Sequence, residues 1–208
     1  MYERIIVPLD GSSLAEQVLP YVLKFGLNNS SKITLLRAYN NASFMIEESS
    51  GIDLDLITAS YQAGAQDYLQ RVGDVLGKAG LSISTTAQED QAASLIVKES
   101  EGEANTLIAM STHGRSGISR WVLGSVTEKV LHATSSPLLI VRAEAKEQAA
   151  SDQRDSQEDS WTGPVVINNV TVPLDGSALA EEILNHAVFA AKALEIPITP
   201  VRVATDSS

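Results

Sequence analysis

Apolar residues follow two alternating patterns along the chain. Short apolar runs, such as RIIVPL and TLIAM, predict buried strands. Between the runs, apolar residues recur every three or four positions, which predicts amphipathic helices. Strands are predicted at residues 4–9, 32–39, 81–85, 106–110 and 137–142, and helices at residues 14–25, 54–78, 92–99 and 126–133.

This alternation predicts an α/β fold over residues 2–143. Since each helix is long enough to cross from one strand to the next, the strands should be parallel and the helices should cover both faces of the sheet. In such sheets the ligand site lies beyond the carboxyl ends of the strands, where the strand order reverses.

The start of the first helix carries three local signals. Ser13 and Glu16 have the spacing of a capping box. Pro20 falls inside the helical pattern, where it should remove a hydrogen bond or kink the helix. Gly26 is expected to end the helix.

The hexapeptide VPLDGS occurs at residues 7–12 and again at residues 172–177. The match continues from DGSSLAEQVL to DGSALAEEIL, which indicates an internal duplication. Strand-like residues 165–174, a helical pattern and a strand near residues 198–203 predict a β-α-β fragment with no phosphate loop of its own. Asp175 is therefore expected to cap a helix rather than bind a ligand.

The two copies are separated by a charged segment. Residues 144–160 include six acidic and two basic residues but no aromatic or large aliphatic one, so they are expected to be a solvated linker. The predicted parts are a complete domain at residues 1–143, an acidic linker at residues 144–163 and a truncated second repeat at residues 164–208.

Composition limits the possible locations and partners. The 208 residues are 44% apolar and 20% charged, as in ordinary globular proteins. No apolar run is long enough to span a membrane, no signal peptide is recognisable, and no cysteine is present for a disulfide or a thiolate metal site. These features together favour a cytoplasmic protein. A net charge of -11 disfavours nucleic acid and anionic membranes as partners.

The segment MSTHGRSGISRWVLGSVTE, residues 110–128, carries the strongest chemical signal. It leaves a strand, passes through a glycine-bearing loop and enters a helix at Ser125, an arrangement that suits phosphate because N–H groups point outward at a helix N-terminus. Arg115, Arg120 and Lys129 make it locally basic. An alternative interpretation is that the glycines only make turns and that Ser125 and Glu128 only cap the helix.

The chain resembles the universal stress protein family in VPLDGS, STHGRSG, RWVLGSVTEKVL and SSPLLIVR. The resemblance covers residues 2–143 and restarts at Val170. It implies a five-stranded parallel sheet of order 3-2-1-4-5, with a crevice between the ends of the first and fourth strands. It also implies a homodimer formed through the strand that runs from Pro137 to Arg142.

The ATP-binding branch of that family carries Gly-x-x-Gly, nine residues, and then Gly with Ser or Thr. The corresponding residues are Ser111, Gly114, RSGISRWVL and Gly124-Ser125, so the spacing is intact but the first glycine is a serine. A serine fits there if its backbone is not left-handed. The resemblance implies an ATP-binding module of stress response or signalling.

The resemblance also implies a role for each site residue. Leu9 and Asp10 would face adenine, Ala38 would contact the base through its backbone, and residues 124–126 would hold the terminal phosphates. Asp10 has an alternative role as a helix cap. The expected ligand-binding residues are Pro8, Leu9, Asp10, Ala38, Met110, Ser111, His113, Gly114, Arg115, Gly124, Ser125 and Val126.

Two other functions are compatible with the sequence. Ser111 and the acidic turn QEDQA at residues 88–92 favour an interaction module of the same fold that has lost nucleotide binding. The other is a slow ATPase or an autophosphorylating protein, although no nucleophile lies beside a base in the sequence. Acidic residues near the crevice would favour Mg²⁺ held by the phosphates of ATP, since no dedicated ligand cluster is visible.

Overall fold

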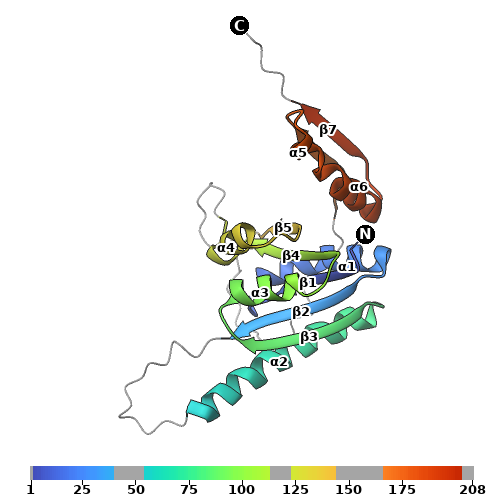
Figure 1. Ribbon diagram of the computed structural model, residues 1–208. Coiled ribbons are helices and arrows are strands. Elements are labelled where there is room, and N and C mark those ends of the chain that lie inside the picture. The colour runs from blue at the N-terminus through green and yellow to red at the C-terminus, as the bar shows by residue number, and fades with distance from the viewer. Residues whose placement is uncertain (1, 40–53, 113–122, 144–165, 203–208) are drawn as a thin grey trace, which may run out of the picture. The chain divides into compact units, whose positions relative to one another are not determined.

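The computed structural model describes residues 2–39, 54–112, 123–143 and 166–202, which belong to two compact units that divide between residues 163 and 164 (Figure 1). The predicted linker lies outside the described residues. The strands of the first unit are β1 (Arg4–Pro8), β2 (Lys32–Tyr39), β3 (Ser82–Glu89), β4 (Thr106–Thr112) and β5 (Leu138–Arg142). Its helices are the 3-10 helix η1 (Ala15–Val18) and the α-helices α1 (Leu19–Asn29), α2 (Leu54–Lys78), α3 (Ala92–Glu101) and α4 (Ser125–Ala133).

The first unit contains a five-stranded parallel sheet of order β3-β2-β1-β4-β5, which confirms the predicted order. The central strand β1 pairs with β2 on one side and β4 on the other, and Ile5 lies opposite both Ile33 and Leu107. The chain therefore reverses its direction of winding between β1 and β4. A ligand site is expected at the carboxyl ends of these two strands.

Helices cover both faces of this sheet, as the alternation of apolar residues predicted (Figure 1). On one face α1 and α2 lie so close to the sheet that a methyl group on Gly26 would meet Leu81, and one on Gly73 would meet Ile83. On the other face α3 and α4 complete an apolar cluster of Ile6, Leu36, Leu95, Ile96, Ile108, Met110 and Val130. This second face leads into the candidate site.

Arg4 fixes helix α3 to the sheet. This arginine is only 7% exposed, and its Nε atom donates to Thr34 Oγ1 at 3.0 Å. Its Nη1 and Nη2 atoms donate to the backbone oxygen and the Oε2 atom of Glu99, at 3.0 and 2.8 Å. Since a buried charge is costly unless it is paired, these contacts hold α3 at a defined place on β1 and β2.

The first helical segment differs from the prediction in three respects. It is split into η1 and α1, and Pro20 lies in the first turn of α1, where its missing N–H removes no intrahelical bond. The side chain that accepts from the first turn is Ser12, from the Ala15 N–H at 3.1 Å, so the predicted cap at Ser13 is wrong. Helix α1 also continues past Gly26 and ends at a left-handed Ser30.

The second unit is a β-α-β arrangement. Its elements are β6 (Val170–Leu174), α5 (Ala178–Glu181), α6 (Ile183–Leu194) and β7 (Ile198–Arg202), and the two strands are parallel. The strand predicted from residue 165 is therefore shorter, beginning at Val170. None of the helices in the described ranges of either unit is long and apolar enough to cross a membrane.

The second unit reproduces the geometry of the first copy, with each residue matched to the one 165 positions earlier in the sequence. Ser12 N donates to Asp10 Oδ1 at 2.9 Å, and Ser177 N donates to Asp175 Oδ1 at 2.8 Å. Glycines 11 and 176 have φ values of 88° and 90°. Asp175 thus forms a turn, and the side chain that caps α5 is Ser177, contrary to the predicted role of Asp175.

Candidate functional site

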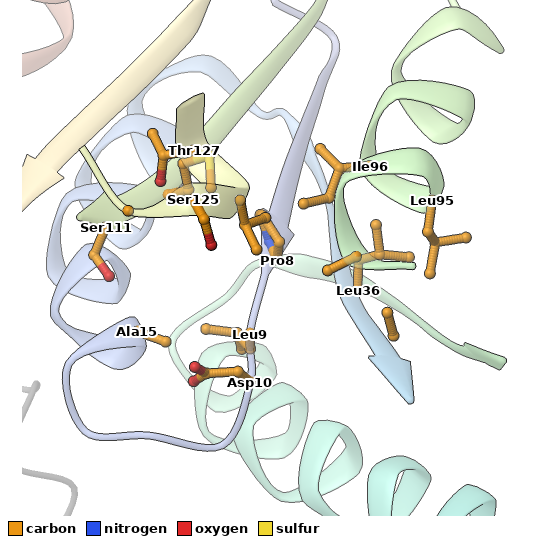
Figure 2. Close-up of a pocket in the computed structure, with 15 residues that line it drawn as sticks. Pro8, Leu9, Asp10, Ala15, Leu36, Leu95, Ile96, Ser111, Ser125 and Thr127 are labelled. Atoms are coloured by element: carbon orange, nitrogen blue, oxygen red, sulfur yellow. The ribbon is translucent and has the colours of Figure 1, made fainter. Parts of the chain in front are cut away.

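A cavity of about 380 Å³ lies beyond the carboxyl ends of β1, β2 and β4, at the predicted reversal of strand order (Figure 2). This volume is within the range of small-molecule sites, about 300–1,000 Å³. It is lined by Pro8, Leu9, Asp10, Ala15, Leu36, Ala38, Ala92, Leu95, Ile96, Met110, Ser111, Gly124, Ser125, Val126 and Thr127.

Most of the residues expected to bind ligand lie together at this cavity. Those that line it are Pro8, Leu9, Asp10, Ala38, Met110, Ser111, Gly124, Ser125 and Val126. His113, Gly114 and Arg115 lie outside the described residues. Segments far apart in the sequence therefore meet at one cavity. The binding roles of these residues remain predictions.

One side of the cavity is apolar. Strand β2 contributes Leu36 and Ala38, and helix α3 contributes the side chains of Leu95 and Ile96, which lie opposite the polar groups in Figure 2. Sequence reasoning missed the α3 residues, because an apolar helix face has the same pattern whether it is core or cavity wall. This side suits a flat, weakly polar ring.

The other side contains the N-terminus of α4. Gly124 is the N-cap, with φ -58° and ψ 150°, and as a glycine it offers no side chain to cap the helix. The predicted cap at Ser125 is therefore wrong, since Ser125 is the first helical residue. Residues 125–127, which carry the first N–H groups of α4, all line the cavity. A helix end of this kind favours an anion because its first N–H groups have no intrahelical partner and the helix dipole is positive there.

Ser111 occupies the place of the first motif glycine without strain. It lies in strand β4, pairs with Val141, and is not among the described residues with positive φ. The residue is 7% exposed, and its Oγ donates to the Leu14 carbonyl at 2.8 Å. The hydroxyl proton is therefore donated to the residue that precedes η1, and Ser111 connects β4 to the segment that follows Asp10.

Asp10 lies at the mouth of the cavity, near Leu9 and Ala15 (Figure 2). Its Oδ1 atom accepts from Ser12 N, which closes a short turn instead of capping a helix. Asp10 is exposed, so part of its carboxylate can still face a ligand.

The acidic turn contributes less charge to the cavity than its sequence suggested. Of residues 88–92 only Ala92 is a lining residue, and Asp90 Oδ1 accepts from the Gln91 N–H. Within the part of the chain that the structure describes, no group of three or more His, Cys, Asp or Glu could hold a metal ion.

Residues 1–142 match the model of the universal stress protein family, which covers the whole sheet and the cavity. The chain belongs to the universal stress protein family. Among curated relatives, universal stress protein MJ0531 of Methanocaldococcus jannaschii is 26% identical over 147 residues, 71% of this chain and 86% of that protein.

Solved universal stress proteins have the same fold. One from Archaeoglobus fulgidus aligns with a TM-score of 0.71 and 23% identity, over 100% of this chain and 70% of that one. Another, solved in complex with cAMP, aligns with a TM-score of 0.52 and 19% identity, over 69% of this chain and 98% of that one. At these identities the likeness extends to the fold alone.

Proposed function

We propose that this universal stress protein binds ATP in the cavity and acts as a nucleotide-dependent module of stress response or signalling. The observation that carries the proposal is that the N-terminus of α4, with glycine as its N-cap, lies at one cavity with the Asp10 turn and an apolar wall. Phosphates would lie at residues 124–126, and adenine would lie between Leu9 and Ala38. The cAMP complex of a fold relative supports an adenine nucleotide as the ligand class.

The intact motif spacing from Ser111 to Gly124-Ser125 supports ATP among adenine nucleotides. A Mg²⁺ ion would be held by phosphate oxygens, which form its preferred oxygen shell with water. The competing proposal is an interaction module without nucleotide. It is favoured by Ser111, whose side chain adds bulk where the family motif has glycine.

Calorimetric titration with ATP, with and without Mg²⁺, tests this function when product formation is assayed on the same sample. We expect saturable binding of one ATP per chain and no turnover beyond a single equivalent. Absence of binding would favour the interaction module, and steady release of ADP would favour an ATPase.

We further propose that residues 164–208 are a truncated second repeat and that the chain forms a homodimer through β5. The matching turns of the two units support the first point. The position of β5 at one end of the sheet supports the second, because an end strand has unpaired backbone groups. Sedimentation equilibrium should give twice the 22.2 kDa chain mass, and a single-chain mass would contradict the dimer.

A further inference from the structure

Arg37 lies on the opposite face of β2 from the cavity. Leu36 and Ala38, its neighbours in the strand, line the cavity, and successive side chains of a strand point to opposite faces. The Arg37 guanidinium lies over the ring of Tyr68 in α2, with Cζ 4.8 Å from the ring centroid. Such a stacked cation is attracted by the ring's negative face.

The same guanidinium contacts the turn that carries Asp10. A Cβ atom on Gly11 would lie 3.1 Å from Arg37 Nη2 and 3.3 Å from Cζ. Gly11 also has φ +88°, a conformation that other residues rarely adopt. The Arg37 guanidinium therefore lies close to both the Gly11 backbone and the Tyr68 ring.

Tyr68 is itself fixed. The residue is only 8% exposed, and its hydroxyl donates to Glu16 Oε1 at 2.9 Å. Glu16 belongs to η1, directly after the Asp10 turn. Tyr68 of α2 thus contacts both Arg37, which lies beside Gly11, and Glu16 of η1, which follows the turn.

The charge of Arg37 is not used in an ion pair with the described residues. Ion pairs in that part of the chain join Arg4 to Glu99 and to Glu103. The contact that Arg37 makes is planar, with the guanidinium over the Tyr68 ring, and lysine cannot reproduce that planar stacking.

The second unit offers an internal comparison. Arg202 corresponds to Arg37, and a Cβ atom on Gly176 would lie 3.0 Å from its Nη2 atom. No tyrosine occurs in residues 166–202. The close approach of arginine to glycine is thus a property of the repeated turn, and the tyrosine beneath the arginine belongs to the first copy.

We propose that Arg37 is a positioning residue, which holds the Asp10–Gly11 turn against Tyr68 and so sets the affinity of the cavity from the opposite face of the sheet. The effect on affinity rests on the proposed nucleotide function. The effect on the turn does not, because it concerns the ligand-free protein.

The ligand test compares adenosine, ADP and ATP by calorimetry on Arg37→Gln. We expect all three dissociation constants to rise by the same factor, roughly tenfold, since the turn would contact the end of the ligand that they share. Arg37→Lys should give a similar loss, and Arg202→Gln should give none. A loss that grows with the number of phosphates, or full recovery with lysine, would overturn the proposal in favour of simple charge attraction.

The ligand-free test measures amide hydrogen exchange at Ser12, whose N–H donates to Asp10. Exchange should be faster in Arg37→Gln and in Tyr68→Leu than in the wild type. If Tyr68→Leu fails to fold, Arg37→Gln alone decides. Unchanged exchange at Ser12 in Arg37→Gln would overturn the proposal. If exchange is faster in Arg37→Gln but the wild type binds no nucleotide, only the nucleotide function would be overturned.

Discussion

At the scale of single residues, the repeated aspartate shows how one side chain shapes a site. Asp10 and Asp175 each accept from the N–H two residues later, and the hydrogen bonds from Ser177 lower the pKa of Asp175. Sequence reasoning assigned Asp175 to a helix cap, because Asp before a helix commonly caps it. In both copies the aspartate accepts its hydrogen bond within the turn, and in the second unit Ser177 caps the helix instead. Asp10 therefore remains at the mouth of the cavity.

Ser125→Glu tests the anion site at the start of α4. Acidic residues in the first turn stabilise a helix, so the variant should melt at or slightly above the wild-type temperature. The new carboxylate would repel phosphate, and we expect ATP affinity to fall at least about tenfold while adenosine affinity changes less. Calorimetry with both ligands measures this difference.

Ser82→Glu is the matched control, because Ser82 is exposed at the opposite end of the sheet. It adds the same charge far from the cavity and should leave ATP affinity unchanged. Equal losses in the two variants would show that net charge, not local repulsion, controls binding.

At the scale of elements, replacing two helical glycines by alanine should change the stability of the protein in opposite directions. Gly64 in α2 has no atom within 4 Å of an added Cβ, so Gly64→Ala should stabilise the protein by about 0.5–1 kcal/mol. Gly26 in α1 would place its Cβ 2.7 Å from Leu81 Cδ2 and 3.2 Å from Ile33 Cδ1, both buried. Gly26→Ala should therefore destabilise by about 1 kcal/mol or more.

Urea unfolding of the two variants measures both free energies. Stabilisation by Gly26→Ala would mean that α1 can move away from the sheet, and destabilisation by Gly64→Ala would mean that this part of α2 is not a regular exposed helix.

The order of elements could be predicted from the sequence, because strand and helix periods differ and VPLDGS marks the same turn twice. Helix ends were less predictable. Pro20 and Gly26 are ordinary breaking signals, yet Pro20 fits a first turn and Gly26 is needed for close packing against Ile33. At the site, the polar motif residues could be predicted from the sequence, but the apolar wall that Leu95 and Ile96 of α3 form could not. Packing alone decides whether such apolar residues line a cavity or lie in the core.

At the scale of the whole molecule, two buried tyrosines should limit stability at high pH. Burial raises the pKa of Tyr2 to about 12, and burial and the Glu16 carboxylate raise the pKa of Tyr68 above its usual range. Above pH 10 the unfolded chain loses these protons while the folded chain keeps them. The stabilisation contributed by these two tyrosines should therefore be fully present below about pH 10. Above that pH the free energy of unfolding should fall, by up to about 1.4 kcal/mol per pH unit for each tyrosine.

Chemical denaturation between pH 8 and about 12 measures this slope. Tyr2→Phe and Tyr68→Phe should each flatten the alkaline decline. Tyr68→Phe should also lower stability at neutral pH, because it leaves the Glu16 carboxylate without the hydroxyl donor. An unchanged slope in both variants would assign the decline to other groups.

A crystal structure of the protein grown with ATP and Mg²⁺ would decide whether the cavity at the reversal of strand order holds ATP. We expect phosphate density at the N-terminus of α4 and adenine density beside Ala38 and Leu9. A cavity filled by its own side chains, or ATP bound elsewhere, would contradict this expectation.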